Sequence, residues 1–274
     1  MTAPDAPSRI RVIVDADASV PAEVRAALRL AVTPAEPELL LERVPIPRLA
    51  LERAAFEADV IAQACGAVAE PGEGVVYVRT GDEYGSPPDA VEAARTAVQA
   101  RGATFRVVDT GAVLMAAGWA AVVAGEAIAD GASLDDAAER AGAAAARTRV
   151  LAMFEHPEIA GLVEPSLYVS APRIVASIAG ADATAIGSVP KREQGLAALR
   201  DQFGAAVRAE AGRPRVAVHH AAAGPAAEAM ALWCRRNLEV AEVVIAPVTR
   251  HQAARLGPGF LALAWLPEEG AAEA

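Results

Sequence analysis

The chain has 274 residues, of which 54% are hydrophobic and only 4% aromatic, and its formal net charge is −10. This length allows two domains of ordinary size, and the negative charge argues against binding to nucleic acid or to an anionic membrane surface. The two cysteines, Cys65 and Cys234, are too few for a disulfide framework. No secretory leader or membrane span is evident, so we expect a soluble, cytoplasmic protein.

In the first half of the chain, apolar runs rich in β-branched residues alternate with segments of helical periodicity. Strands are expected at residues 10–14, 30–32, 39–44, 75–78 and 104–108. Helices are expected at residues 21–28, 48–66, 89–100, 111–130 and 134–147, the last capped by Ser133. This alternation predicts an α/β domain over residues 1–147, with a parallel βαβ sheet and helices on both of its faces.

From residue 148 onward the strands become shorter and less regularly spaced. Strands are expected at residues 150–154, 166–169, 185–189, 215–219, 240–247 and 260–266. Helices are expected at residues 172–178, 192–211 and 225–237, and residues 248–259 are expected to form a loop. This order predicts an α+β domain over residues 148–274.

The loop TGDEYGSPPD follows the strand at residues 75–78 and leads into a helix. It offers the hydroxyl groups of Thr80 and Ser86 and the backbone N–H groups of Gly81 and Gly85 next to the positive end of a helix dipole. Such a loop favours an anionic ligand at the carboxyl edge of a parallel sheet. The alternative interpretation is an ordinary strand-to-helix turn.

Polar side chains also follow two other strands. Asp15 and Asp17 come after the first strand, and Asp109 and Thr110 come after the strand at residues 104–108. Asp15, Asp17 and the nearby Ser19 hydroxyl can cap the following helix. The three aspartates can instead converge at the sheet edge and bind Mg²⁺, as in an α/β transferase.

No motif in the chain points to a metal or a nucleotide cofactor. His219 and His220 end a strand and His251 lies in an expected loop, but the histidines lack the spacing of a zinc site. The chain has no glycine-rich dinucleotide or P-loop motif after a strand and no Gly-x-Ser-x-Gly elbow. We therefore expect no metal and no cofactor.

Taken in order, several segments resemble motifs of the DegV family, whose members include the fatty-acid-binding subunits of bacterial fatty acid kinase. The segment VIVDADASVP resembles the family's strand followed by Asp-Ser-x-x-Asp-Leu-Pro, and VVYVRTGDEYGSPPDAVEAA resembles its strand followed by Ser-Ser-x-Leu-Ser-Gly-Thr. VVDTGAVLMAAGWAA resembles Ile-Asp-Ser with a Gly-rich helix, and RLGPGFLALAW resembles His-x-Gly-Pro-Gly with a final strand. Lys191-Arg192 and Arg173-Ile174 match parts of two further motifs, so the resemblance covers nearly the whole chain.

The chain departs from the family where the ligand's head group is held. The family's Thr-Ser-Gln-Pro-Ser motif, whose Thr helps to bind the carboxylate, has its nearest counterpart in VPIPR, which places Val44 at the hydroxyl position. Asp82 and Glu83 add negative charge to the Thr80 loop. Arg255 replaces the His before Gly-Pro-Gly, and its guanidinium group can pair with a carboxylate. The alternative interpretation of Arg255 is a solvated loop residue.

The resemblance implies a two-domain DegV-like protein that binds a long-chain fatty acid and is not itself an enzyme. The acyl chain would lie in an apolar tunnel of the first domain, with its carboxylate bound by Thr80, Gly81, Gly85, Ser86 and Arg255. Supporting loop residues would be Asp15, Asp17, Asp109, Thr110, Gly257, Pro258 and Gly259. A separate kinase subunit would then phosphorylate the presented carboxylate. The alternative is a degenerate relative that binds another small anion or acts as a regulatory or interaction module.

Overall fold

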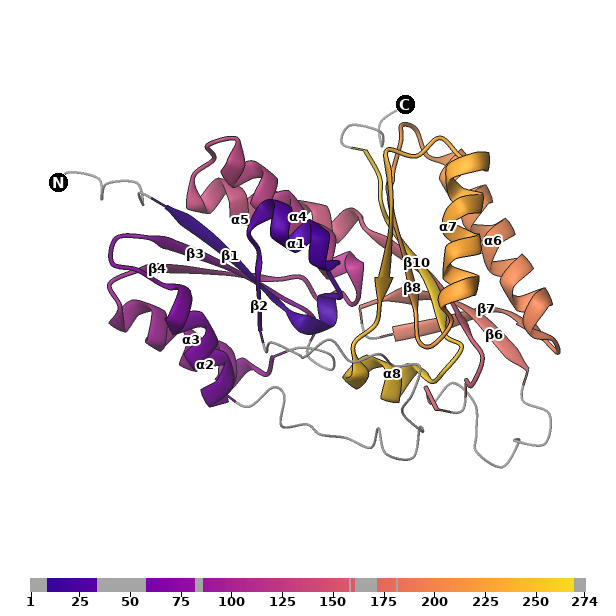
Figure 1. Cartoon of the computed structure of the whole chain (residues 1–274), viewed down its shortest axis with the longest axis horizontal. Coiled ribbons are helices and arrows are strands. Elements are labelled where there is room, and N and C mark those ends of the chain that lie inside the picture. The colour runs from indigo at the N-terminus through magenta and orange to yellow at the C-terminus, as the bar shows by residue number, and fades with distance from the viewer. Residues whose placement is uncertain are drawn as a thin grey trace. The chain divides into compact units, whose positions relative to one another are not determined.

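The computed structural model describes residues 9–33, 58–81, 86–157, 159–160, 172–180 and 182–268. Figure 1 labels most of the helices and strands in this part of the chain. Contacts between Cα atoms divide it into two compact units. The first unit contains the described residues up to 113 and residues 117–146, and the second contains residues 114–116 and the described residues from 147 onward.

The first unit is built on a parallel sheet with the strand order β2-β1-β3-β4. Its strands are β1 (Ile10–Asp15), β2 (Ala31–Thr33), β3 (Gly74–Arg79) and β4 (Thr104–Asp109). Strand β3 is buried along its whole length, as its continuous apolar run predicts for a strand covered on both faces. The parallel βαβ sheet expected from the sequence is confirmed.

Helices lie on both faces of this sheet (Figure 1). On one face, α2 (Ala58–Val68) and α3 (Pro88–Ala100) bury their apolar side chains against Ile13, Tyr77 and Phe105. Helices α1 (Ala22–Leu28), α4 (Met115–Ala129) and α5 (Leu134–Arg147) lie toward the other face. The expected cap of α5 is confirmed, because the Ser133 hydroxyl accepts a hydrogen bond from the Asp136 N–H at 3.1 Å.

The second unit contains a mixed sheet with the strand order β7-β6-β5-β10-β8-β9. Its strands are β5 (Arg149–Phe154), β6 (Arg173–Ala179), β7 (Asp182–Val189), β8 (Arg215–His220), β9 (Glu242–Pro247) and β10 (Leu261–Leu266). Strands β8 and β9 pair in parallel, and the other neighbours pair antiparallel. The expected α+β character is confirmed.

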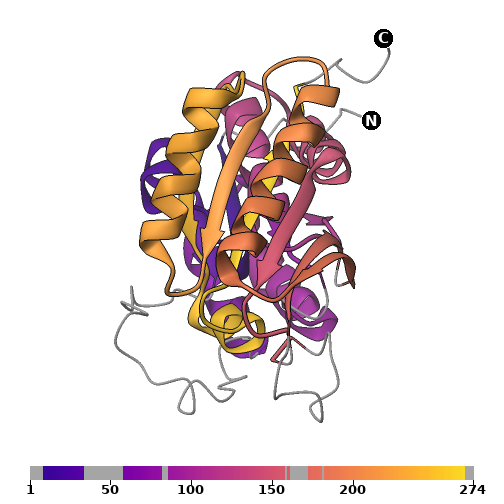
Figure 2. The same cartoon turned by 90° about the vertical axis from the view of Figure 1, so that its right-hand side faces the viewer.

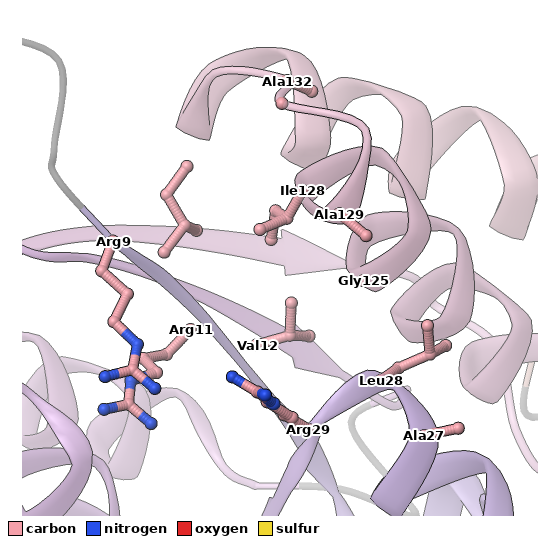
Figure 3. Close-up of a pocket in the computed structure, with 12 residues that line it drawn as sticks. Arg9, Arg11, Val12, Ala27, Leu28, Arg29, Gly125, Ile128, Ala129 and Ala132 are labelled. Atoms are coloured by element: carbon pink, nitrogen blue, oxygen red, sulfur yellow. The ribbon is translucent and has the colours of Figure 1, made fainter.

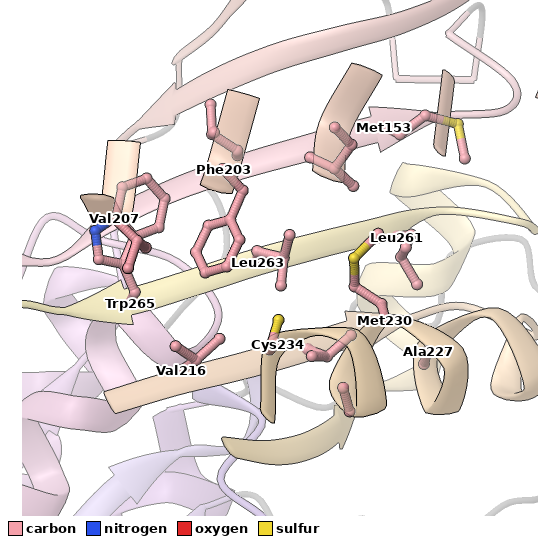
Figure 4. Close-up of a cluster of buried hydrophobic side chains, with 14 of the residues drawn as sticks. Met153, Phe203, Val207, Val216, Ala227, Met230, Cys234, Leu261, Leu263 and Trp265 are labelled. Carbon is pink, nitrogen blue, oxygen red and sulfur yellow. The ribbon is translucent and has the colours of Figure 1, made fainter. Parts of the chain in front are cut away.

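Helices α6 (Arg192–Ala209) and α7 (Gly224–Asn237) cover one face of this mixed sheet (Figure 2). Their apolar side chains form the core of the second unit with residues of β5, β8 and β10 (Figure 4). The rings of Phe203 and Trp265 meet edge to face at a centroid distance of 5.3 Å, a favoured geometry for an aromatic pair.

Two sequence-based expectations for the second unit are wrong. Residues 172–178 were expected to form a helix, but Arg173–Ala179 form β6, an inner strand between β5 and β7. The β-branched residues Ile174, Val175 and Ile178 suit this position. The expected loop at residues 248–259 contains α8 (Arg250–Leu256), which begins with a capping box formed by Thr249 and Gln252.

Some expectations lie outside the described residues. These are the strands expected at residues 39–44 and 166–169, the start of the helix expected at residues 48–66, and the positions of Val44, Asp82, Glu83 and Gly85. In the described part of the chain, no helix combines the length and apolarity that a membrane-spanning segment needs.

Candidate functional site

A buried polar network surrounds the carboxyl group of Asp15, at the carboxyl end of β1. Asp15 is 1% exposed. Its Oδ1 accepts hydrogen bonds from the Tyr77 hydroxyl at 2.5 Å and the Ser86 hydroxyl at 2.6 Å. Its Oδ2 accepts from the Thr80 backbone N–H at 2.9 Å, the Thr80 hydroxyl at 3.1 Å and the Ser86 backbone N–H at 3.3 Å. The loop after β3 therefore binds a carboxyl group, and the group comes from the chain itself.

The oxygen atoms in this network are close enough to favour a neutral Asp15. The Tyr77 and Ser86 hydroxyl oxygens also lie 2.5 Å apart, so they form a triangle of short contacts with Asp15 Oδ1. An ionised Asp15 leaves two hydroxyl protons for three contacts, whereas a protonated Asp15 supplies the third proton. Burial raises the pKa of Asp15, against the lowering effect of hydrogen bonds from Ser86, Tyr77 and Thr80. Burial and the nearby Asp15 also raise the pKa of Tyr77.

Sequence reasoning missed Arg79, which connects this network to the end of β4. Arg79 is only 4% exposed, and its Nε donates to the Ser86 carbonyl oxygen at 2.6 Å. Its Nη1 forms an ion pair with Asp109 Oδ2 at 2.7 Å. The Thr110 hydroxyl donates to the Arg79 carbonyl oxygen at 2.7 Å. The available signal was an arginine at the end of a buried strand, a residue type that is rarely buried without partners.

Gly81 allows the loops after β3 and β4 to approach each other closely. Its backbone N–H donates to the Ala112 carbonyl oxygen at 2.8 Å. A Cβ at this position would lie 3.2 Å from the Gly111 carbonyl oxygen, closer than a side-chain carbon comfortably approaches. The role of Gly81 in the described structure is therefore steric, and Gly85, its expected partner in ligand binding, lies outside the described residues.

The structure gives Asp15 and Asp109 partners other than the helix cap and the metal ion weighed from the sequence. Asp15 does not cap the following helix, because its carboxyl oxygens accept hydrogen bonds from Tyr77, Thr80 and Ser86. Asp17 is fully buried in a short 3₁₀ turn, Ala16–Ala18, and Asp109 pairs with Arg79. Among the described residues, no group of three or more His, Cys, Asp or Glu side chains could hold a metal ion.

A second polar cluster, in the second unit, centres on Glu155, a residue that sequence reasoning did not single out. Glu155 Oε1 accepts from Nε and Nη2 of Arg173 at 2.8 and 2.6 Å, and Oε2 accepts from Nη1 of Arg192 at 2.7 Å. Burial alone would raise the pKa of Glu155, but the hydrogen bonds and charges of Arg173 and Arg192 outweigh it and lower that pKa. The carboxyl group of Glu155 is therefore ionised near neutral pH.

The Gly-Pro-Gly loop packs directly against this cluster. The Gly259 carbonyl oxygen accepts from Arg192 Nη1 at 3.3 Å. Gly259 has a φ of +77°, and a Cβ there would lie 2.8 Å from Arg192 Nη1 and 3.0 Å from Glu155 Cβ. Gly257 also has a positive φ, of +80°. Arg173, Arg192 and the Gly-Pro-Gly loop come from three separate segments that resemble family motifs, and all three thus lie around Glu155.

Arg255, the expected cation of the site, lies half-buried in the last turn of α8. Pro258 separates the two glycines of the loop that follows. The roles of Arg255 and Pro258 in ligand binding remain predictions.

His219 is a structural residue of the second unit. It is fully buried, with Nδ1 2.9 Å from the Ala246 carbonyl oxygen, and Nε2 accepts from the Met115 N–H at 3.1 Å. These partners require the neutral tautomer with the proton on Nδ1. Burial lowers the pKa of His219 to about 3, so the ring stays neutral near pH 7.

The sequence matches no family profile and no curated protein. The structure, however, is similar to solved structures of DegV family proteins. A fatty-acid-binding DegV family protein from Thermus thermophilus has a TM-score of 0.74 and 16% identity, over 95% of this chain and 100% of that one. A DegV family protein from Corynebacterium glutamicum has a TM-score of 0.69 and 20% identity, over 95% of this chain and 98% of that one.

A DegV family protein from Eubacterium eligens, loaded with heptadecanoic acid, has a TM-score of 0.68 and 14% identity, over 94% of this chain and 100% of that one. Similarity at such low identity establishes the fold and leaves the ligand open. The resemblance expected from the sequence is thereby confirmed at the level of architecture: the chain has the two-domain α/β fold of the DegV proteins.

Proposed function

We propose that this protein is a divergent DegV protein that binds a long-chain fatty acid and has no catalytic activity of its own. The observation that carries the proposal is the fold, since similarly folded proteins from Thermus thermophilus and Eubacterium eligens bind fatty acids. The ligand's carboxyl group would bind at the loop after β3, beside Thr80 and Ser86.

The Asp15 network supports this location because a ligand's carboxyl group would use the same kind of hydrogen-bond donors that bind the Asp15 carboxyl group. Two backbone N–H groups and three hydroxyl groups already converge on one carboxyl group. Each hydroxyl has a single proton to donate, so a ligand carboxylate must compete with Asp15 or bind beside it. A neutral Asp15 permits the second arrangement, because it avoids placing two carboxylates next to each other.

The acyl chain would supply most of the affinity. Each buried methylene group contributes about 0.8 kcal/mol, so a long chain can tolerate a head-group site that differs from that of its relatives. Arg255 would add a positive charge for the carboxylate. A kinase subunit would act on the carboxylate presented in this way, as the family resemblance implies.

The same network favours one alternative. If Asp15 permanently occupies the carboxylate-binding loop, the site is closed internally, and the protein acts as a regulatory or interaction module or binds a different small anion. This alternative predicts that removing the Asp15 carboxyl group opens the loop to added ligands.

Native mass spectrometry with extraction of any bound lipid tests the proposal. We expect a stoichiometric fatty acid, or binding of added oleate or palmitate, that is weakened by Ser86→Ala and Arg255→Ala. The exposed positions Ser188→Ala and Arg236→Ala provide matched controls. A wild-type protein that carries no lipid and takes up neither oleate nor palmitate would contradict fatty-acid binding. Uptake that appears only in Asp15→Ala would then support the internally closed site.

A further inference from the structure

The first unit contains a pocket at the opposite end of β1 from Asp15. Its cavity volume is about 470 Å³, which is within the range of small-molecule sites. The pocket lies between the start of β1, the end of α1 and the end of α4 (Figure 3). Arg11 and Asp15 are four residues apart on β1, so at a rise of about 3.3 Å per residue their Cα atoms are separated by about 13 Å.

Three arginines line this pocket. Arg9 and Arg11 extend to the same side of β1, as their spacing of two residues requires, and Arg29 extends toward β1 from the end of α1 (Figure 3). Only Arg11 has an acidic partner among the described residues, Glu73, with Arg11 Nε 3.5 Å from Glu73 Oε2. Neither of these two atoms has a hydrogen-bond partner in that part of the chain. Among the described residues that line the pocket, Arg9 and Arg29 therefore contribute two positive charges without an acidic partner, in a chain whose net charge is −10.

The backbone of Arg29 adds an independent observation. Arg29 follows α1 with a φ of +56°, in the left-handed region. Glycine is the usual residue at such a position because it avoids the steric cost of a Cβ. Arg29 therefore ends α1 in a conformation that usually favours glycine, and it lines the pocket at this point.

The edge of β1 is also open at this pocket. Strand β2 pairs with β1 only from Ile13 onward. Among the described residues, the backbone of Ile10–Val12 therefore has no strand partner on that side.

The remaining wall of the pocket is apolar. Leu28 and Ile128 line it from α1 and α4 (Figure 3). Gly125 allows this close helix packing, because a Cβ there would lie 3.0 Å from Leu30 Cδ2 and 3.3 Å from Leu28 Cβ. A ligand that suits this pocket combines a strongly anionic group with a small apolar group.

We propose that this pocket binds a small phosphate monoester. The dianionic phosphate would pair with Arg9 and Arg29, with Arg11 shared between the phosphate and Glu73. The organic group would reach past the open edge of β1 to Leu28 and Ile128, which lie on the side of the strand opposite the Arg9 and Arg11 side chains (Figure 3). Two excess positive charges match a dianion, and guanidinium groups bind phosphate oxygens in paired hydrogen bonds. This site is separate from the proposed fatty-acid site and does not depend on it.

Isothermal titration calorimetry of the full chain tests the proposal, with inorganic phosphate, phenyl phosphate and benzoate as probes. We expect phenyl phosphate to bind at least tenfold more tightly than either of the others, because only it has both the dianion and the apolar group. Absence of phenyl phosphate binding, or equal affinity for benzoate, would overturn the proposal.

Arg29→Gly is the most informative variant because it removes the guanidinium group and relieves the left-handed backbone strain together. We expect at least a tenfold loss of phenyl phosphate affinity with unchanged or increased thermal stability. Arg9→Gln should weaken binding similarly. Arg101→Gln, which removes the same charge at an exposed position of the first unit, should leave affinity unchanged. Equal affinities in Arg29→Gly and Arg101→Gln would show that any binding occurs elsewhere.

Discussion

The Asp15 carboxyl group and the Tyr77 hydroxyl group lie 2.5 Å apart in the interior of the first unit. The two residues belong to neighbouring strands, β1 and β3, and are 62 positions apart in the sequence. Because both are buried, little water reaches the pair, and the protonation state of Asp15 depends mainly on its protein partners. That dependence makes the stability of the first unit sensitive to pH.

The first prediction concerns this pH dependence. A carboxyl group with a raised pKa in the folded state contributes its full stability below its ordinary pKa of 3.8 and loses it as the pH rises through the folded-state pKa. We therefore expect the free energy of unfolding of the wild type, relative to Asp15→Asn, to fall as the pH rises from the acid range toward neutrality. Urea denaturation of both proteins over a series of pH values measures this difference.

Asp15→Asn is a suitable reference because an amide can satisfy the same partners. Its oxygen can accept from the Thr80 and Ser86 N–H groups, and its NH₂ group can donate to the Tyr77 and Ser86 hydroxyl oxygens after these rotate. Asp15→Ala leaves several buried donors without an acceptor. At about 1–3 kcal/mol for an unsatisfied buried group, we expect this variant to lose at least about 2 kcal/mol. If the free energy of unfolding of the wild type instead rises with pH relative to that of Asp15→Asn, Asp15 is ionised in the folded protein.

Tyr77→Phe provides a second prediction from the same network. The substitution removes a hydrogen bond that stabilises the ionised form of Asp15 and should cost about 1–2 kcal/mol at neutral pH. With one donor fewer, the pKa of Asp15 should rise further. The pH range over which stability falls should therefore shift upward relative to the wild type, which the same urea denaturation series would detect. An unchanged range would indicate that the Tyr77 hydroxyl is not a partner of Asp15.

The sequence predicted those features of the first unit that depend on local patterns. The continuous apolar run in GVVYVR correctly predicted β3 as a buried parallel strand, and the position of Ser133 before an apolar periodic segment predicted the cap of α5. The carboxyl group of Asp15 was assigned to a local cap because the sequence shows its neighbours along the chain. Its true partners, Tyr77, Thr80 and Ser86, become visible only when β1 and β3 pair.

The errors in the second unit have similar causes. Residues 172–178, PRIVASI, were assigned to a helix, whereas Arg173–Ala179 form a strand because they pair with β5 and β7, and the sequence alone does not show that pairing. Glu155 was missed because it is a single glutamate after a strand, and only the fold brings Arg173 and Arg192 to it. Helix α8 was detectable, since Thr249 and Gln252 have the spacing of a capping box and Gly257 ends the helix.

Gly259→Ala tests the packing of the Gly-Pro-Gly loop against Glu155 and Arg192. The added methyl group must displace Arg192 Nη1 and Glu155 Cβ, which would lie 2.8 and 3.0 Å from it, and the backbone keeps a positive φ. We expect a loss of about 2–4 kcal/mol in the free energy of unfolding, combining the backbone and steric costs. Urea denaturation measures the total.

Gly72→Ala separates the two contributions. Gly72 has nearly the same φ, +79°, but a Cβ there meets no atom within 4 Å. This control should therefore lose only the backbone contribution of about 1 kcal/mol. Equal losses in the two variants would show that Arg192 and Glu155 move aside at no cost.

The last prediction concerns His219, whose pH dependence should be opposite to that of Asp15. Its pKa is about 3 in the folded state, against an ordinary value of 6.5. A group with a lowered pKa contributes its full stability above the ordinary pKa and loses it as the pH falls toward the folded-state value. We therefore expect His219 to destabilise the second unit progressively as the pH falls from 6.5 to about 3. Comparing the wild type with His219→Gln by urea denaturation should show this acid-dependent difference, because glutamine does not titrate.

Nitrogen NMR of the His219 imidazole provides a direct readout of its protonation state. It should show the neutral tautomer protonated on Nδ1, which donates to Ala246, with no titration near pH 6.5. A ring that titrates near 6.5 would contradict the buried position and both of its hydrogen bonds.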